Sequence, residues 1–166
     1  MTAIKRNKIA DYLNVGTGDT EEYALMGFGF ETLDEEYGAQ TDTTCYINQE
    51  TASTTVISYD GEFPYSFALI KEEKALMSLQ RTGRNHETGT DAERDYVRAD
   101  LFDPVEGNEG SYKARKFRVT NVPTATKGNG GEKVKTDGSL KTVGDPIQGT
   151  FNVKTKTFTA DTESTV

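Results

Sequence analysis

The stretch from residue 54 to residue 82, TTVISYDGEFPYSFALIKEEKALMSLQRT, changes its hydrophobic period near its middle. Apolar and polar residues alternate over residues 54–63, which predicts a half-buried strand with an acidic outer face. Further along, the apolar residues recur with helical spacing, and Ser66 and Gly83 stand at positions where helix caps are common. The stretch therefore predicts a strand followed by one amphipathic α-helix over residues 67–82, packed on a sheet.

Alternation with a period of two residues also marks several segments outside this stretch. We expect an N-terminal arm over residues 1–20, and residues 43–50 fit either a strand or the far side of a long hairpin. The basic strand at residues 111–122 shifts its apolar side partway along, which predicts a bulge. The last segment predicts a hairpin that turns near residues 152–156. The predicted strands cover residues 22–33, 54–63, 94–103, 111–122, 133–143 and 147–159.

The length of 166 residues predicts a single domain. Six or seven strands with one helix predict an α+β, mainly β, fold: an antiparallel β-sandwich or barrel-like sheet with one flanking α-helix and long loops. Only 34% of the residues are hydrophobic, so we expect the chain to need neighbours for full order. The N-terminus lacks the apolar region of a signal peptide, and no segment has the length of a membrane span, so we expect no membrane partner.

The acidic residues are distributed unevenly along the chain. Residues 11–62 contain twelve Asp or Glu and no Lys or Arg, whereas the other 114 residues contain fifteen acids and nineteen bases. Such asymmetry bears on partners rather than on fold, because the acidic block either repels an anion or docks on a cation. The net charge of −8 argues against nucleic-acid binding through phosphate neutralisation.

The sequence contains no recognisable catalytic constellation. The single histidine, His86, lies in a polar loop, where exposure is the common outcome and pairing with a nearby acid is the alternative. We expect the single cysteine, Cys45, to be a partly buried small hydrophobe. The acids of residues 34–42 suggest a cation site but lack the spacing of a calcium loop. We therefore expect a protein that is not an enzyme and that uses neither a cofactor nor a metal.

An acidic block and a basic strand in one small chain favour head-to-tail self-association. Heterologous contacts bring unlike surfaces together and can close into rings, and opposite charges orient such contacts. The alternative is that the basic strand is only a solvated hairpin face. A ring that turned the acidic block inward would have a lumen that repels phosphate, so DNA could pass through it without being bound.

Five segments spread over nearly the whole chain resemble one family. They are KRNKIADYLNVG at residues 5–16, YALMGFGFETLDEEYGAQTDTTCYINQETAST at 23–54, EFPYSFALI at 62–70, DYVRADLFDPVEG at 95–107 and GDPIQGTFNVKTKTFT at 144–159. These segments resemble major tail proteins, the tail tube proteins of long-tailed phages and prophages of Gram-positive bacteria. The resemblance lies in these sequence segments and not in a catalytic motif.

The resemblance implies a β-sandwich flanked by one helix, six subunits in a ring, and rings stacked into a tube whose lumen conducts DNA. Strands of adjacent subunits would join into an inner barrel that includes residues 22–33 and 54–63, with the helix on the outer side. The N-terminal arm and an extended loop at residues 34–52 would contact the next ring.

The resemblance also implies partners and a location. The partners would be further copies of the chain, a tape measure protein, and tail terminator and baseplate proteins, while DNA would transit the lumen without specific binding. The protein would lie in the tail tube of a virion and would be assembled in the host cytoplasm.

Two sets of candidate residues follow from the resemblance and the charge pattern. A register error of one residue would reverse the face assigned to the first set. Candidates for the lumen are Glu22, Glu31, Asp60 and Glu62; candidates for contacts between subunits are Asp34, Glu35, Glu36, Tyr37, Tyr46, Lys113, Arg115, Lys116 and Arg118. Three other functions stay open: a tube subunit of a phage-like bacteriocin or injection machine, a surface-binding β-module, and a metal-dependent enzyme.

Overall fold

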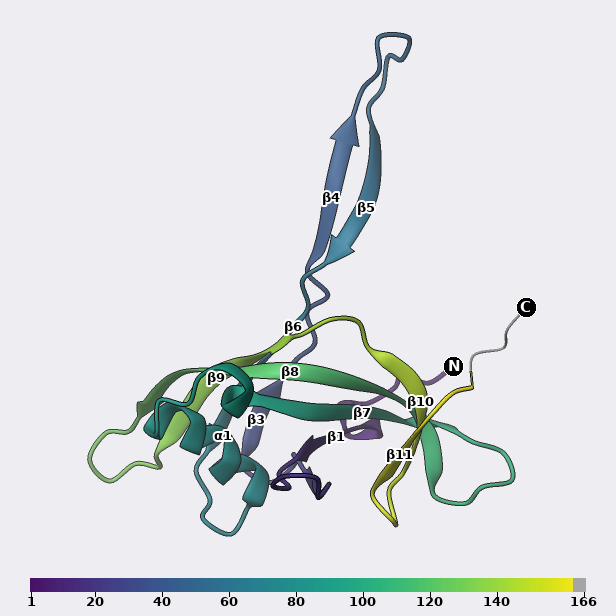
Figure 1. Cartoon of the computed structure of the whole chain (residues 1–166). Coiled ribbons are helices and arrows are strands. Elements are labelled where there is room, and N and C mark those ends of the chain that lie inside the picture. The colour runs from purple at the N-terminus through teal and green to yellow at the C-terminus, as the bar shows by residue number, and fades with distance from the viewer. Residues whose placement is uncertain (163–166) are drawn as a thin grey trace.

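The computed structural model describes residues 1–162 of the chain (Figure 1). It consists of a nine-stranded antiparallel sheet, a separate two-stranded hairpin and one α-helix. The strands are β1 (Ile9–Asn14), β2 (Tyr23–Leu25), β3 (Phe30–Leu33), β4 (Ala39–Thr44), β5 (Ser53–Tyr59), β6 (Glu62–Ala68), β7 (Glu93–Pro104), β8 (Ser111–Lys127), β9 (Lys135–Thr142), β10 (Ile147–Asn152) and β11 (Thr157–Ala160). The α-helix is α1 (Lys74–Arg84), and two 3₁₀ turns lie at Arg6–Lys8 and Gly89–Ala92.

The long strand β8 lies at the centre of the sheet. The main path runs β2-β1-β7-β8-β9-β6-β3, with every pair antiparallel. One edge of β8 pairs with β7, and its other edge is shared between β10 at Ser111–Lys116 and β9 at Val119–Lys127. β11 then pairs with β10, and the turn between them covers residues 153–156, which confirms the predicted C-terminal hairpin.

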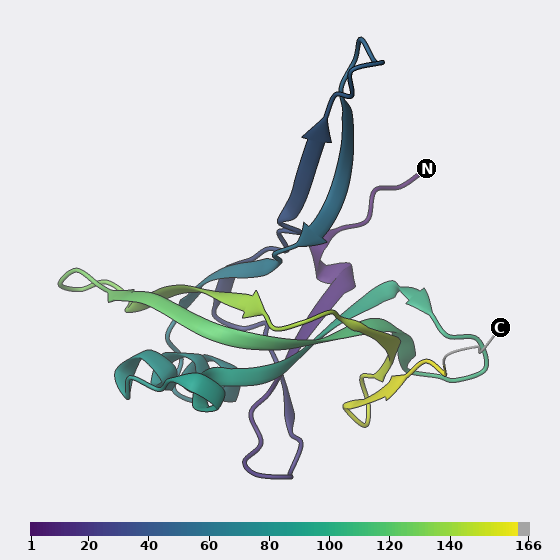
Figure 2. The ribbon, with the colours of Figure 1, turned by 45° about the horizontal axis from the view of Figure 1, so that its top comes forward.

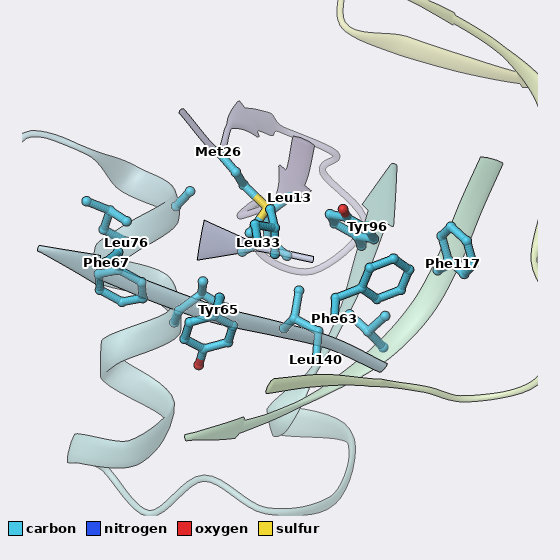
Figure 3. Packing of buried hydrophobic residues seen from close by; sticks show 13 residues of the cluster. Leu13, Met26, Leu33, Phe63, Tyr65, Phe67, Leu76, Tyr96, Phe117 and Leu140 are labelled. Carbon is cyan, nitrogen blue, oxygen red and sulfur yellow. The ribbon is translucent and has the colours of Figure 1, made fainter. Parts of the chain in front are cut away.

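The sheet has two separate cores, one on each face. The larger core packs α1 against β6 and includes Phe63, Phe67 and Leu76, as Figure 3 shows. The smaller core lies on the opposite face beneath β10 and β11 and includes Val97 and Phe151. A strand that contributes to both cores therefore has apolar residues on one side along part of its length and on the other side along the rest.

This arrangement corrects the predicted bulge in the basic strand. Ala114 belongs to the smaller core and Phe117 to the larger one, while the pairing of β7 with β8 stays regular from Glu93 to Ala99. One register shift lies opposite Tyr112–Ala114, but its additional residues belong to β7, between Ala99 and Pro104; another lies near Pro123 on β8.

The helix begins later than the sequence predicts. Residues 62–68 form β6, because Phe63, Tyr65 and Phe67 alternate into the larger core and pair with β9. The predicted cap Ser66 lies within this strand, and Glu73 occupies the N-cap of α1 without a side-chain cap. Gly83 lies inside the helix, where a Cβ atom would come within 3.1 Å of the Pro123 side chain. Glycine thus permits the close approach of α1 to β8.

Strand pairing also corrects the predictions for residues 22–33 and for residues 1–20. The predicted strand at residues 22–33 is two strands, because β2 pairs with β1 and β3 pairs with β6, with Gly29 in the turn at φ 90°. The predicted arm at residues 1–20 contains β1, whose residues Asp11 and Leu13 are buried between β2 and β7.

Strands β4 and β5 form a hairpin that stands away from the rest of the molecule in both views (Figures 1 and 2). Every residue of β5 is exposed, so the predicted half-buried strand at residues 54–63 is wrong over its first part. The chain instead leaves the hairpin at Asp60–Gly61 and enters the core at Phe63. The hairpin interpretation of residues 43–50 is the correct one, since these residues end β4 and form the tip.

Candidate assembly interface

The projecting hairpin has two chemically different faces. Cross-strand pairing sets Ala39 opposite Tyr59 and Thr41 opposite Val56, so these side chains form an apolar face. The other face is polar and includes Gln40, Asp42, Thr44, Ser53, Thr55 and Ser58. Because the register shifts between Gln40 and Thr41, Ile57 is an extra residue in β5.

The apolar residues of the hairpin are exposed to an unusual degree. Val56, Ile57 and Tyr59 are 49%, 65% and 69% exposed, and at the tip Tyr46 and Ile47 reach 63% and 108%. An isolated two-stranded hairpin is at best marginally stable in water, and a contiguous exposed apolar surface usually marks an interaction site. The hairpin therefore has the properties of a docking element.

The root of the hairpin is tied to the sheet by backbone hydrogen bonds. Glu36 and Glu62 form an isolated β-bridge with N–O distances of 2.9 and 3.0 Å, and the Asp60 amide donates to the Gly38 carbonyl at 2.9 Å. A hydrogen bond with the Glu62 carboxyl, desolvation, and the charges of Glu62 and Asp34 raise the pKa of Glu36. Two carboxyl groups thus crowd the point where the hairpin leaves the sheet.

A bidentate ion pair joins this root to β8. The two terminal nitrogens of Arg115 each donate to one carboxylate oxygen of Glu35 at 2.9 Å, and the guanidinium lies 5.2 Å from the centre of the Phe117 ring. Burial lowers the pKa of Arg115, but the hydrogen bonds and charge of Glu35 outweigh this effect, so the pKa lies above its ordinary value. Tyr37 and Tyr59 line a cavity of about 160 Å³ next to this pair.

The structure brings part of the predicted subunit-contact set together within one chain. Glu35 and Arg115 bind each other, and the remaining cations of β8 also have acidic partners nearby. Lys113 pairs with Asp103 at 3.8 Å, Lys116 with Asp95 at 3.9 Å, and Arg118 with Glu93 and Asp95 at 3.2 Å. Of the same set, Asp34, Glu36 and Tyr37 lie at the root of the hairpin, and Tyr46 lies at its exposed tip.

Ten of the twelve acids of the block fall into two groups in three dimensions. Four of its acids form ion pairs with cations from outside the block: Asp11 with Arg6 and Arg98, Glu22 with Lys74, Glu31 with Lys135, and Glu35 with Arg115. Six others lie on the hairpin or at its root, where residues 34–62 contain no Lys or Arg: Asp34, Glu36, Asp42, Glu50, Asp60 and Glu62. The unneutralised acidity is therefore concentrated around the docking element.

The four candidate lumen residues do not form one cluster. Glu22 forms an ion pair with Lys74 of α1, so it lies on the helix side of the sheet. Glu62 accepts a hydrogen bond from Ser139 at 3.2 Å on the opposite side of β6 from the buried Phe63. Glu31 of β3 reaches across β6 to Lys135 of β9 at 3.1 Å. Asp60 is exposed at the root of the hairpin.

The face on which Glu62 lies is an open polar surface of β6, β9, β8 and β7. Register sets Glu62, Lys141, Thr120 and Glu93 in one row across the four strands. Including neighbouring rows, five acids and five cations share this face: Glu31, Glu62, Glu93, Asp95 and Asp137 with Lys116, Arg118, Lys127, Lys135 and Lys141. We call this surface the open face.

Sequence reasoning missed most of the open face because it depends on long-range register. Lys141 lies opposite Glu62 only through the pairing of β6 with β9, and no local signal predicts that pairing. Asp137 belongs to the same surface, and hydrogen bonds with Ser66 and Lys127 lower its pKa below the ordinary value. Most charges of the open face therefore lie next to an opposite charge.

The residues considered for chemistry stay apart. His86 is exposed after the end of α1 with a φ of 51°, and Cys45 is exposed at the hairpin tip, not partly buried as predicted. Across residues 1–162, no group of three or more His, Cys, Asp or Glu side chains is placed to hold a metal ion. The same part of the chain has no helix with the length and apolarity needed to span a membrane.

No protein-family model and no curated protein sequence matches the chain. Its fold, however, is similar to that of solved tail structures. The SPP1 tail tube matches with a TM-score of 0.67 at 11% identity, covering 88% of this chain and 78% of that chain. A chain from the tail of an empty gene transfer agent particle with C6 symmetry matches with a TM-score of 0.61 at 9% identity, covering 95% and 100%.

A chain in the six-fold symmetrised baseplate of the anti-feeding prophage matches with a TM-score of 0.52 at 7% identity, covering 93% of this chain and 98% of that chain. At these low identities the likeness establishes the fold and not the activity. The chain therefore has the mainly antiparallel β architecture with one α-helix that is found in tail tube proteins.

Proposed function

We propose that this chain is a structural subunit that assembles with copies of itself into a tail tube, without catalysis. The observation that carries the proposal is the two-faced hairpin, whose apolar residues are exposed in the single subunit on a fold shared with tail tubes. Docking the hairpin on the next subunit would cover Val56, Ile57 and Tyr59 and remove the cost of their exposure.

The finer organisation follows from the same fold. Six subunits would close into a ring, as the six-fold symmetry of two similar structures suggests, and rings would stack through the hairpin. The N-terminal segment and the other candidate contact residues at the root would extend this interface. The helix α1 would face outward, and the open face would line the bore.

A bore lined by the open face would be nearly neutral, which differs from the strongly acidic lumen expected from the sequence. The acids and cations of this face balance, and most lie within reach of an opposite charge. Glu31 and Glu62 would belong to this lining, Asp60 would add acid at its rim, and Glu22 would lie on the outer side. Cations that are already paired with acids bind DNA phosphates weakly, so DNA could still pass through the bore without being held.

In a virion the tube would enclose a tape measure protein and end at terminator and baseplate proteins, after assembly in the host cytoplasm. A tube of an injection machine is the second candidate, because a chain from the anti-feeding prophage baseplate shares the fold. Both candidates require the same self-assembly, and the contents of the tube distinguish them.

The test compares two double substitutions on the same strand of the hairpin. V56N/Y59N changes the apolar face, and T55N/S58N places the same number of asparagines on the polar face. We expect the first variant to remain folded by circular dichroism but to form no tubes in negative-stain electron microscopy, because the docking surface has lost its apolar residues.

The second variant should form tubes like the unmodified chain. Normal tubes from V56N/Y59N, or no ring or tube from the unmodified chain at any concentration, would refute the proposal. A stable monomer in sedimentation would instead favour a surface-binding module.

A further inference from the structure

A group of six charged residues crosses the sheet from the N-terminal segment to the root of the hairpin. It consists of Arg6, Asp11, Arg98, Arg115 and Glu35, with Asp100 on the same strand as Arg98 and near both central arginines. Register places Asp11 opposite Arg98, and Arg98 opposite Arg115. The charges come from three neighbouring strands and two flanking segments, and they sum to zero.

The inner members of the group are deeply buried. Asp11 is 2% exposed and Arg98 5%, and Asp11 accepts hydrogen bonds from Tyr96 and from Arg6, the latter at 2.7 Å. Nε of Arg98 lies 3.5 Å from the Asp11 carboxylate, and its guanidinium lies 5.7 Å from the centre of the Phe63 ring. These contacts fix Arg98 in place.

Two arginines directly opposite each other on a sheet repel, so Arg115 needs acidic neighbours. Asp100 supplies one of them, and burial raises its pKa although Arg115 and Arg98 oppose the shift. Glu35 supplies the other and is only 14% exposed in its side chain. Arg115 is therefore repelled from Arg98, stacked on Phe117 and held toward Glu35.

The hairpin joins the sheet through residues that allow bending. Gly38 has a φ of 61° and lies opposite Asp60, and Gly61 follows on the returning strand, where it lines the cavity of about 160 Å³. Backbone hydrogen bonds tie this root to the sheet, but the two glycines restrict the backbone torsions least, so a side-chain contact can still decide the angle of the hairpin. The Glu35–Arg115 pair, at the foot of this root, is anchored in the rigid charged group.

We propose that the Glu35–Arg115 ion pair fixes the angle at which the hairpin leaves the sheet and thereby positions it for docking on the next subunit. The two residues act within one chain, and the bidentate geometry of arginine is what resists bending. The positioning of the hairpin for docking rests on the proposed function, whereas the angle itself is a property of the single subunit.

The experiment measures that angle directly on dilute, unassembled protein. A nitroxide on the native Cys45 at the tip and a second one at T124C on the exposed part of β8 report a distance distribution by pulsed electron resonance. We expect a narrow distribution in the parent chain and at least about a twofold broader one in E35Q and in R115K, since neither retains two charged N–H···O contacts.

R118Q is the matched control, because Arg118 lies three residues along the same strand and forms ion pairs on the open face. It should leave the distribution unchanged. R115K keeps the positive charge, so it provides a folded variant if E35Q unfolds. Unchanged widths in both E35Q and R115K would overturn the inference.

Assembly is then measured separately on unlabelled chains. A roughly tenfold rise in the concentration needed for tubes, in the broadened variants only, supports the positioning role. Broadened distributions with normal tube formation overturn that role. Absence of tubes from the parent chain, together with broadened distributions, leaves the angle assignment standing and refutes the proposed function alone.

Discussion

Single carboxylates in this protein have different energetic roles that depend on their partners. Asp11 is buried between two arginines and a tyrosine, so its charge is compensated inside the fold. Glu36 faces Glu62 and Asp34 at the root of the hairpin and has no cation within reach among residues 1–162. Acids of the first kind stabilise the subunit at neutral pH, and acids of the second kind repel each other there.

The pair Glu36–Glu62 predicts a local dependence on pH. Because the folded state raises the pKa of Glu36, the folded root binds a proton more tightly than the unfolded chain. The root should therefore be less stable at pH 7 and gain stability as the pH falls through the raised pKa. Hydrogen-exchange protection of the Glu36 and Glu62 amides, corrected for intrinsic rates, should rise on acidification.

E36Q should show the higher protection already at pH 7 and little further change, since glutamine can donate to Glu62 without a charge. D42N, on the exposed polar face of the hairpin, is the control and should follow the parent chain. Protection at the root that falls on acidification in the parent chain would contradict this assignment.

At the scale of elements, α1 depends on tertiary contacts more than on its own ends. Its N-cap residue Glu73 has no side-chain cap, and its buried residues pack on β8 and β2. A buried hydrogen-bond chain also holds it, because Tyr65 donates to Asn121 at 2.6 Å and Asn121 donates to the Leu79 carbonyl at 2.9 Å. The helix is positioned by the sheet.

E73D should stabilise the protein by about 1 kcal/mol, because aspartate is a preferred N-cap and glutamate is not. The charge at the start of the helix stays the same, so the gain would come from a side-chain hydrogen bond to the first free amides. Urea unfolding followed by circular dichroism measures the change. E72D, one residue earlier and outside the helix, should have an effect near zero, and an equal gain there would argue against capping.

How far the sequence predicts these elements depends on what each element pairs with. β7 follows from local alternation alone, and its predicted bounds at residues 94–103 nearly match. The start of α1 cannot be predicted in this way. Phe63, Tyr65 and Phe67 have the spacing of a strand, whereas Leu69 and Ile70 continue the apolar stripe of the helix. The pairing of β6 with β9 determines where the strand ends. Local sequence patterns cannot predict a boundary that depends on pairing with a strand far away in the sequence.

The candidate interface was also only partly predictable from local sequence patterns. Residues 54–59 alternate like a half-buried strand, but in the single chain both of their faces are exposed, since the surface that would cover them is absent from the chain itself. Glu35 and Arg115 were selected by charge as contacts between subunits, and the fold joins them to each other. Charge composition favoured self-association, but it did not predict that Glu35 and Arg115 bind each other within one chain.

At the scale of the whole molecule, acidity and basicity are spatially separated. Six acids without cations surround the hairpin, while all nineteen Lys and Arg residues lie outside residues 11–62. Head-to-tail stacking would bring the acidic hairpin onto the more basic body of the next copy. Such an encounter is driven partly by electrostatics that salt can screen.

Tube formation should therefore slow as salt increases, because the Debye length falls from about 10 Å at 0.1 M to about 3 Å at 1 M. Light scattering measures the rate. D42N/E50Q, which removes two hairpin charges, should assemble more slowly at low salt and lose most of this dependence. E72Q/E106Q removes two exposed charges from the body and should keep it; equal behaviour of the two variants would contradict the steering role of the hairpin.

The exposure of β5 along its entire length has a consequence for how such subunits diversify. Since the hairpin contributes little to the core, its apolar face can drift without harming the fold, provided that the receiving surface of the next copy drifts with it. Two lineages with superimposable sheets would then cease to copolymerise. Two such chains produced together would then form two separate polymers, each selected by its own hairpin.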